Sequence, residues 1–476
     1  MDINKQFLKF VIIVILLPLA ACKNPFMERI LGKNNNEESP YTGHPGMGTE
    51  TDPWIVHNVD TLRRVGTDPE PLAPEDPPSW HLGAHYRQVR NITLPAPEPG
   101  GSNWTPIGSS VAPFTGTYNG NGRTISGLII NSPDSDLGMF GYIAGPLVPE
   151  RVAVRNLGLV NVSINGNGTG PPSFRVGGIA GNNGGTIQNC NVSGSVSGTG
   201  SEVGGLVGNN QIGGIVQSSF STAAVSSTEG HNVGGLVGDN LGSVRNSYAT
   251  GVVTGWGANY RIGGLVGRNN ANIENCYATG TVRAFPGGPP ENFADNNIGG
   301  LVGENQGTGT VQNSYATGSV SGTENVGGIA GINISTIQNC YATGTVTGFT
   351  NVGGVVGNSS GVLQNCVALN YDISGNQFNT KRIAGILSGT PSNNYGRVTM
   401  RYNNDPSHTW DDIGGDRPNG HNISNAEFYS TWWESPPGGW NSASPWLWGN
   451  VWDNVRPDRL PTLLNMPQGI QTPRVN

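Results

Sequence analysis

Two groups of residues carry the side chains that hydrolytic enzymes use, and neither has the arrangement that catalysis needs. Residues 357–361 match the G-x-S-x-G pattern of a serine nucleophile, but that pattern requires a strand followed by a helix, and the surrounding sequence predicts a turn. Acidic residues occur singly and at differing repeat positions, as Glu202, Glu229, Asp239, Glu274, Glu304 and Glu324. Because glycoside cleavage needs two or three converging carboxylates, we expect no enzyme activity. A polysaccharide-active enzyme is the alternative that these acids leave open.

A row of aromatic residues is the strongest candidate for binding. The row occupies one position of an internal repeat and consists of Phe220, Tyr248, Tyr277, Tyr315 and Tyr341. If the neighbouring cysteine and alanine residues point into a coil of strands, these rings point outward and stack about 4.8 Å apart. Such a strip would bind a glycan or the apolar surface of a protein. The alternative is that the rings only stabilise adjacent coils or lie beneath a loop.

A row of asparagines recurs with the same period, at Asn183, Asn210, Asn240, Asn269, Asn305 and Asn333. Asparagine tolerates left-handed backbone angles and forms hydrogen bonds along a stack, so we predict a structural ladder at a corner rather than a ligand site. The position one residue earlier varies in chemistry and is expected to face solvent. There, Asp239, Arg268 and Glu304 in successive coils would form a charge ladder.

The cysteines of the repeats argue against metal chemistry. Cys190, Cys276, Cys340 and Cys366 share one repeat position, where other copies have serine. Interchange with serine indicates a small side chain in a stack, and no grouping has the spacing of zinc ligands. We predict free thiols and no metal or other cofactor. A disulfide between Cys340 and Cys366 would need a particular Cβ geometry.

These rows must be positioned by a stacked repeat. The phrase V-G-G-L-V-G at Val203 to Gly208 recurs, and the glycine pairs at 177, 204, 234, 263, 299, 327 and 353 are 26 to 36 residues apart. A second phrase, such as residues 273–280, alternates apolar and polar residues, which predicts strands. Short strands that are joined without helices can complete their hydrogen-bonded ladders only if the chain coils, so that each strand pairs in parallel with its copy in the next turn. We therefore predict an all-β, right-handed parallel β-helix, a solenoid with N-terminal and C-terminal caps.

Composition and charge limit the class of partner. Only 12% of residues are charged, 74 are glycine, and the net charge is −7. Such a composition is typical of a turn-rich all-β protein. The 25 lysines and arginines form no basic stripe, so no nucleic acid is expected as a partner. We expect a monomer.

The first 22 residues have the pattern of an export signal. An apolar run from Phe10 to Leu17, too short to span a bilayer, is followed by Leu19-Ala20-Ala21-Cys22. This sequence resembles the bacterial lipobox, which implies cleavage before Cys22 and acylation of that residue. The expected location is therefore the envelope of a diderm bacterium, with a lipid anchor in the membrane and Lys23 compatible with the outer membrane. A plain secretory signal is the alternative.

The chain divides into six segments by composition. We predict a signal peptide at 1–21, a flexible tether at 22–50, an N-terminal cap at 51–103 with a short helix near Val59 to Val65, opening coils at 104–175, the repeat β-helix at 176–390 and a C-terminal cap at 391–476. The last segment holds seven of the eleven tryptophans. We expect these rings to cover the open end of the β-helix.

Residues 176–385 resemble the bacterial GLUG repeat, and the resemblance extends more weakly to residues 104–108 and 114–128. Such repeats occur in surface and secreted adhesin-like proteins and beside some bacterial proteases. The repeat is defined by architecture, so it implies no catalytic residues, and the protease motif His-Glu-x-x-His is absent from this sequence. The resemblance implies a non-enzymatic surface protein for adhesion or ligand binding. A purely structural envelope protein is a further alternative.

Overall fold

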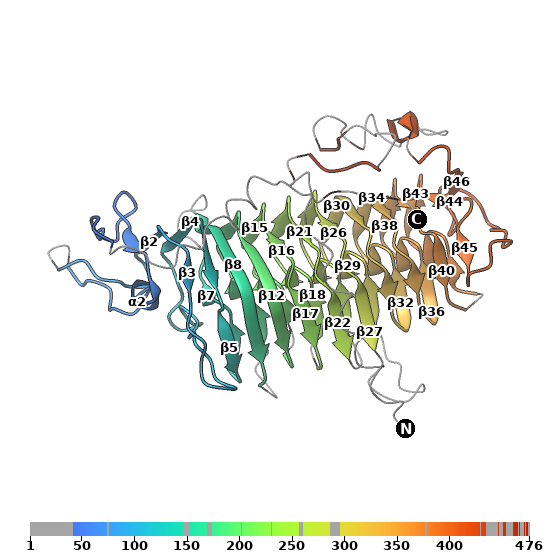
Figure 1. The fold of residues 1–476 in the computed structure, drawn as a ribbon. Coiled ribbons are helices and arrows are strands. Elements are labelled where there is room, and N and C mark those ends of the chain that lie inside the picture. Colours follow the sequence, from blue (N-terminus) through green and yellow to red (C-terminus); the bar gives the residue numbers. More distant parts are fainter. Residues whose placement is uncertain are drawn as a thin grey trace, which may run out of the picture.

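The fold is a β-solenoid of about 12 turns, seen along its length in Figure 1. The computed structural model describes residues 41–73, 76–145, 152–168, 174–200, 202–229, 231–256, 260–285, 296–376, 378–428, 430–434, 446, 451–453, 460–464, 466, 471 and 473–474. The parallel β-helix that the repeats predict is confirmed. In Figure 1 the near strands β15, β16 and β17 succeed one another downward while the chain advances to the right, so the coil is right-handed.

Sheet 1 is the largest of three sheets and has 28 strands among the described residues. It begins within the segment expected to form the N-terminal cap and continues beyond residue 390. Its strands are β1 Trp54–Val56, β2 His85–Gln88, β3 Ile92–Thr93, β4 Thr117–Ser126, β5 Ile129–Ser132, β8 Val152–Gly166, β11 Thr186–Gln188, β12 Asn191–Gly198, β15 Ile215–Gln217, β16 Phe220–Ser221, β17 Ala224–Ser227, β20 Ser243–Arg245, β21 Tyr248–Ala249, β22 Val253–Trp256, β25 Asn272–Glu274, β26 Tyr277–Ala278, β27 Val282–Phe285, β30 Thr310–Ala316, β31 Val320–Ser321, β34 Thr336–Ala342, β35 Val346–Thr347, β38 Val362–Gln364, β39 Val367–Ala368, β40 Asp372–Ser374, β43 Thr390–Ser392, β44 Tyr395–Arg397, β45 Arg401–Tyr402 and β46 His421–Ile423.

Sheets 2 and 3 contain nine strands each and run along the rest of the coil. Sheet 2 consists of β7 Phe140–Ile143, β10 Ala180–Asn183, β14 Val207–Asn210, β19 Val237–Asn240, β24 Val266–Asn269, β29 Val302–Asn305, β33 Ala330–Asn333, β37 Val356–Ser359 and β42 Ala384–Leu387. Sheet 3 consists of β6 Asp136–Leu137, β9 Arg175–Gly177, β13 Glu202–Gly204, β18 Asn232–Gly234, β23 Arg261–Gly263, β28 Asn297–Gly299, β32 Glu324–Gly327, β36 Thr350–Gly353 and β41 Thr380–Lys381.

Successive turns pair in parallel and in register. In sheet 2, Val207 pairs with Val237 and Asn210 with Asn240, and the same partners recur in the following turns. In sheet 1, Tyr248 pairs with Tyr277. Because equivalent residues lie opposite one another in every turn, each repeat position becomes a row of side chains along the solenoid.

The V-G-G-L-V-G phrase forms a sharp corner between sheets 3 and 2. Strand β13 ends at Gly204 and β14 begins at Val207. A Cβ atom on Gly204 would lie 2.0 Å from the carbonyl oxygen of Val207, and one on Gly208 would lie 2.7 Å from that of Gly181. Only glycine fits such close backbone approaches. The corner allows Val203, Leu206 and Val207 all to be fully buried, although strict alternation along one strand would not.

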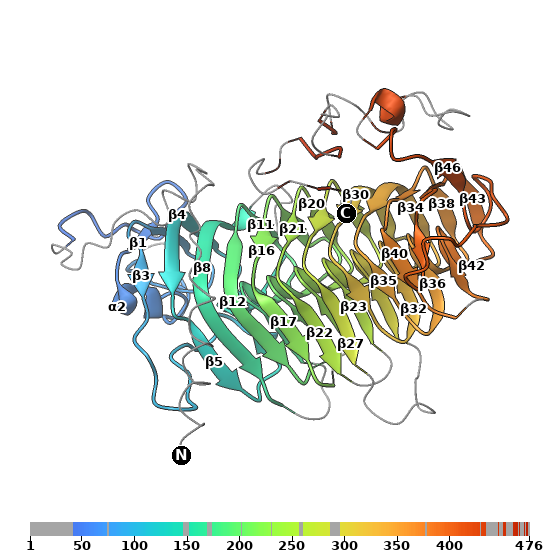
Figure 2. The same ribbon diagram turned by 45° about the vertical axis from the view of Figure 1, so that its right-hand side comes forward.

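The two ends of the solenoid are closed differently. Near the N-terminus, helix α2 Val59–Arg63 begins at Asn58, whose side chain forms a capping box with Thr61, and this confirms the predicted helix. At the other end, residues 414–421 cross the last turn, where the amide groups of Ile383 and Ala384 donate to the carbonyl oxygen of Pro418. Figure 2 shows the C-terminal segment turning back from this end along the side of the solenoid.

A buried arginine holds this closing segment in place. The guanidinium of Arg382 donates to the carbonyl oxygens of Gly396, Arg397 and Gly420 at 3.0 to 3.3 Å. Burial lowers the pKa of Arg382 to about 10. The residue stands where earlier turns have the second glycine of the repeated phrase, so it marks the point at which the repeat stops.

Candidate functional site

The aromatic row forms the predicted stack on the outer side of sheet 1. Successive rings of Phe220, Tyr248, Tyr277, Tyr315 and Tyr341 have centroids 4.7 to 5.0 Å apart and planes within 5° of parallel. The tyrosines belong to an apolar cluster that is distinct from the solenoid core, where the neighbouring cysteines and alanines lie. The rings therefore point away from the interior, as the alternation of residues predicts.

The prediction of an exposed binding strip is nevertheless wrong for the four tyrosines. Tyr248, Tyr277, Tyr315 and Tyr341 are each at most 1% exposed, and only Phe220, at the end of the row, is half-buried. Aromatic and aliphatic residues of the returning C-terminal segment pack on them: Phe428, Trp432, Trp433, Trp446, Trp452, Leu460, Leu463 and Met466. We call these residues the strap. The strap removes a large aromatic surface from water, which favours the covered state.

Contacts between the strap and the strip are specific. Trp433 meets Tyr341 edge-on, with ring centroids 5.7 Å apart. The Tyr341 hydroxyl donates to the carbonyl oxygen of Pro461 at 2.7 Å, and the Tyr315 hydroxyl donates to Gln471 Oε1 at 3.1 Å. Gln471 is itself fixed by two hydrogen bonds with the backbone of Leu463. The strap is thus positioned by polar contacts as well as by apolar packing.

Four of the seven tryptophans of the C-terminal segment do not have the predicted role. Trp432, Trp433, Trp446 and Trp452 cover the side of the solenoid over the tyrosines, whereas residues 414–421 close its end. Trp410 packs beside Tyr402, with its indole donating to the carbonyl oxygen of Met400. Trp440 and Trp448 lie outside the described residues. A tryptophan-rich tail can shield an exposed face as well as an open end, so its composition does not distinguish the two.

The asparagine row is a continuous hydrogen-bonded ladder inside the solenoid. Each carboxamide donates to the next at 2.8 to 2.9 Å, from Asn183 through Asn210, Asn240, Asn269 and Asn305 to Asn333. All six side chains are fully buried. The structural role is confirmed, but left-handed backbone angles belong to a different row, which includes Asn189, Asn246, Asn275, Asn339 and Asn365.

The ladder also accounts for the G-x-S-x-G motif. Ser359 continues the asparagine row, is fully buried, and its Oγ accepts a hydrogen bond from Asn333 Nδ2 at 3.2 Å. It lies at the end of strand β37. The hydroxyl is therefore a structural partner of Asn333, away from solvent.

Much of the variable row is a buried polar seam, and its remaining members Arg268, Ile332 and Asn358 are half-buried, which corrects the prediction that the row faces solvent. Asp239 and Glu304 are 1% and 6% exposed because the glycine corner brings the outer residues of sheets 2 and 3 together. Arg268 forms the expected ion pair with Asp239, with Nε 2.9 Å from Oδ1. Glu304 instead pairs with Arg261 and accepts from Asn297. Burial and the nearby Asp239 raise the pKa of Glu202, also in this seam, to about 6.

The four repeat cysteines are free thiols and are buried in the core. The Sγ atoms of Cys340 and Cys366 contact the carbonyl oxygens of Gln338 and Gln364, two residues earlier in each chain segment, at 3.2 Å. Burial raises the pKa of Cys190 and Cys276 to about 12, which keeps these thiols protonated. Among the described residues, no three His, Cys, Asp or Glu side chains gather closely enough to hold a metal ion.

A second aromatic feature, which the sequence analysis missed, remains exposed on sheet 1. Trp256 and Phe285 end the paired strands β22 and β27, are 41% and 42% exposed, and stack with centroids 5.6 Å apart. The preceding outward position carries half-buried Thr254 and exposed Arg283. We call these four residues the Trp256 face. The signal that could have revealed it is the shared position of two aromatic residues three places after Val253 and Val282.

Replacing Trp433 with alanine tests the strap. Loss of a buried tryptophan costs about 3 to 5 kcal/mol, so the strap should detach locally from Tyr341. Burial raises the pKa of Tyr248, Tyr277 and Tyr341. Because the folded protein favours the neutral phenol, each buried tyrosine keeps its full contribution to the stability of the fold below the unfolded-state pKa of about 10. That contribution is lost as pH rises toward the folded-state pKa, because the phenol ionises first in the unfolded chain.

An ultraviolet titration of tyrosine ionisation measures this effect. In Trp433→Ala, Tyr341 should ionise at lower pH than in the unmodified chain. Trp256→Ala, which also removes one tryptophan but lies outside the strap, should leave the titration unchanged. Identical titration curves for Trp433→Ala and the unmodified chain would contradict the covering role of the strap.

Family comparison agrees with the geometry of the repeats. The model described as "The GLUG motif" matches residues 173–197, 229–254, 258–283, 294–321 and 322–347. These segments contain five of the seven glycine pairs, all of the asparagine row except Asn210, and the four tyrosines of the aromatic row. Among the described residues, no helix is long and apolar enough to cross a membrane, and Cys22 lies outside them.

Similar proteins share part of this chain. A protein of Evansella cellulosilytica, provisionally named a Gly-rich membrane protein, is 35% identical over 151 residues, which cover 31% of this chain and 15% of that protein. Halomucin of Haloquadratum walsbyi is 30% identical over 188 residues, 38% of this chain and 2% of halomucin. The chain thus spans a small part of both relatives.

A solved structure from Bacteroides ovatus, provisionally named an immunoglobulin A1 protease, has 16% sequence identity and a TM-score of 0.37, covering 88% of this chain and 94% of that one. A similarity of this size supports no statement on function. The repeats, their corner glycines and the family match together show that the chain contains GLUG-motif repeats, which form part of a β-solenoid.

Proposed function

We propose that this chain is a lipid-anchored protein of the bacterial envelope that binds glycans on the outer face of its solenoid. The names of its relatives, a Gly-rich membrane protein and halomucin, fit an envelope or surface location. The lipobox-like sequence ending at Cys22 supports the lipid anchor. In this proposal the solenoid serves adhesion, because it holds the binding residues at a distance from the membrane to which Cys22 is anchored.

The Trp256 face is the observation that carries the binding proposal. The indole and phenyl rings offer apolar surface to the C–H faces of sugar rings. Arg283 and Thr254 lie beside them and supply donors and an acceptor for sugar hydroxyl groups. Arg283 forms no hydrogen bond or ion pair with the described residues. The buried tyrosine strip would reach a ligand only if the strap opened, so it is not the proposed site.

A glycan array tests this proposal with matched variants. We expect the purified exported part of the chain to bind a subset of the printed polysaccharides. The double variant Trp256→Ala, Phe285→Ala should lose about tenfold or more in affinity, because aromatic anchors dominate such contacts. Ile212→Ala removes another exposed apolar side chain and should bind as the unmodified chain does.

Two results would contradict glycan binding at this face. The first is equal binding by the double variant. The second is the absence of binding by the unmodified chain to every printed glycan, which would favour a purely structural envelope protein. Shortening of a bound polysaccharide would instead support the enzymatic alternative.

The lipid anchor is tested separately by Cys22→Ser in cells that supply labelled fatty acid. The unmodified chain should carry the label and sediment with membranes, because several acyl chains anchor stably. The variant should lose both label and sedimentation. A Cys22→Ser chain that still sediments with membranes would contradict anchoring through this residue.

A further inference from the structure

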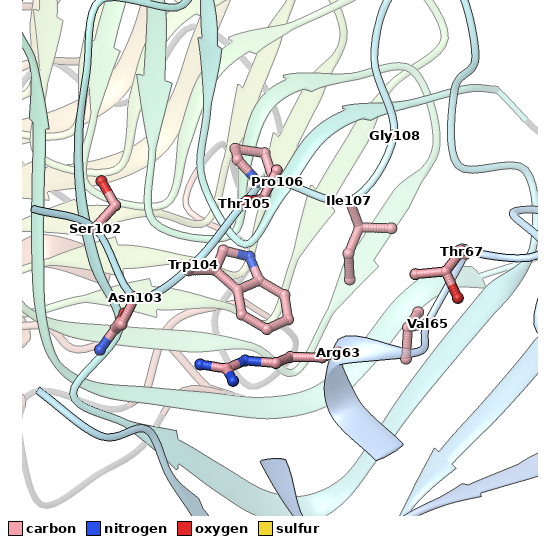
Figure 3. Close-up of a pocket in the computed structure, with 11 residues that line it drawn as sticks. Arg63, Val65, Thr67, Ser102, Asn103, Trp104, Thr105, Pro106, Ile107 and Gly108 are labelled. Carbon is pink, nitrogen blue, oxygen red and sulfur yellow. The ribbon is translucent and has the colours of Figure 1, made fainter. Parts of the chain in front are cut away.

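The N-terminal end of the solenoid contains a pocket that shares no residue with the tyrosine strip or the Trp256 face. Its volume is about 520 Å³, within the range of about 300–1,000 Å³ that is typical of small-molecule sites. Figure 3 shows Arg63, at the end of helix α2, extending toward the segment that carries Asn103 and Trp104. The pocket therefore lies between α2 with its following loop and residues 102–108.

Arg63 is the only charged residue among the eleven that line the pocket. It is exposed and forms no hydrogen bond or ion pair with the described residues. The adjacent Arg64 differs, because it pairs with Asp68 and lies 4.8 Å above the ring of Trp80. Arg64 thus has a structural role, while the guanidinium of Arg63 is available for a ligand.

Three apolar side chains form part of the pocket wall. The indole nitrogen of Trp104 donates to the carbonyl oxygen of Met139 at 3.0 Å, which fixes the ring. Val65 and Ile107 are the other two and are 3% and 7% exposed. These side chains offer an apolar surface to one side of a ligand.

The rim of the pocket contributes one free hydroxyl group. Thr105 is exposed and its side chain forms no hydrogen bond with the described residues. The other polar side chains are engaged by the protein: Asn103 bonds to the carbonyl oxygens of Pro95 and Gly127, and Ser102 exchanges hydrogen bonds with the backbone of Asn131. The groups left for a ligand are therefore one guanidinium and one hydroxyl beside an apolar wall.

We propose that this pocket binds a uronic acid unit of an acidic glycan. The carboxylate of such a sugar matches the planar fork of Arg63, which can donate two parallel hydrogen bonds. A ring hydroxyl would bond to Thr105, and the apolar face of the sugar would contact Ile107 and Trp104. The site is separate from the Trp256 face and does not depend on glycan binding there.

Ligand-observed NMR with three small probes tests the pocket. D-glucuronate should show saturable binding to the unmodified chain, whereas D-glucose and acetate should bind more weakly, since each lacks one of the two recognised features. We expect dissociation constants in the millimolar range, because the site makes few contacts. Arg63→Gln should weaken glucuronate binding by about tenfold or more, as loss of a charge-assisted bidentate pair does.

A charge-matched variant serves as the control. Arg123 is exposed on strand β4 and is likewise without a partner among the described residues, so Arg123→Gln changes the net charge equally and should bind glucuronate as the unmodified chain does. Thr105→Val should weaken glucuronate binding without affecting acetate. Equal glucuronate binding by Arg63→Gln and the unmodified chain, acetate binding as tight as glucuronate binding, or no saturable binding of glucuronate would each overturn the proposal.

Discussion

In-register parallel pairing between successive turns is the constraint on which the rest of the molecule depends. Each strand lies opposite its own counterpart, so any residue type that recurs in the sequence becomes a continuous row. Where the residue is asparagine, the row is a ladder of carboxamide hydrogen bonds through the interior. Where it is tyrosine, the row is a stack of parallel rings. A shift of one residue would move both rows to the opposite face of their strands.

The glycine corner is the second condition for this architecture. It lets sheets 2 and 3 approach so closely that three apolar residues of one short phrase all enter the core. It also brings the polar residues on the outer side of the corner together, where ion pairs between turns replace their contacts with water. Such pairs must compensate for lost hydration, so the seam is more important for register than its variable sequence suggests.

Prediction from sequence succeeds here wherever a property depends on the repeat alone. The repeat period predicts the solenoid, the asparagine row predicts the ladder, and the exchange of cysteine with serine predicts buried free thiols. Prediction fails where a segment outside the repeat decides the outcome. The alternation of apolar and polar residues correctly predicts that the Tyr277 side chain points outward. Its burial depends on the path of the strap, which is not part of the repeat and has no periodic sequence. Prediction also fails for Asp239, although its burial depends on the repeat: its charge suggests a surface position, but the sequence pattern does not reveal how closely sheets 2 and 3 approach at the glycine corner.

The two binding sites that we propose lie where the repeat is interrupted. Trp256 and Phe285 share a repeat position that carries no aromatic residue in the neighbouring turns, and Arg63 lies before the repeats begin. The strap covers the tyrosines, whereas Trp256 and Phe285 remain exposed. Hydroxyl-radical footprinting of the intact chain measures both at once. We predict strong oxidation of Trp256 and Phe285 and protection of Tyr248, Tyr277, Tyr315 and Tyr341. Oxidation of these tyrosines at the rate of Trp256 would contradict this prediction.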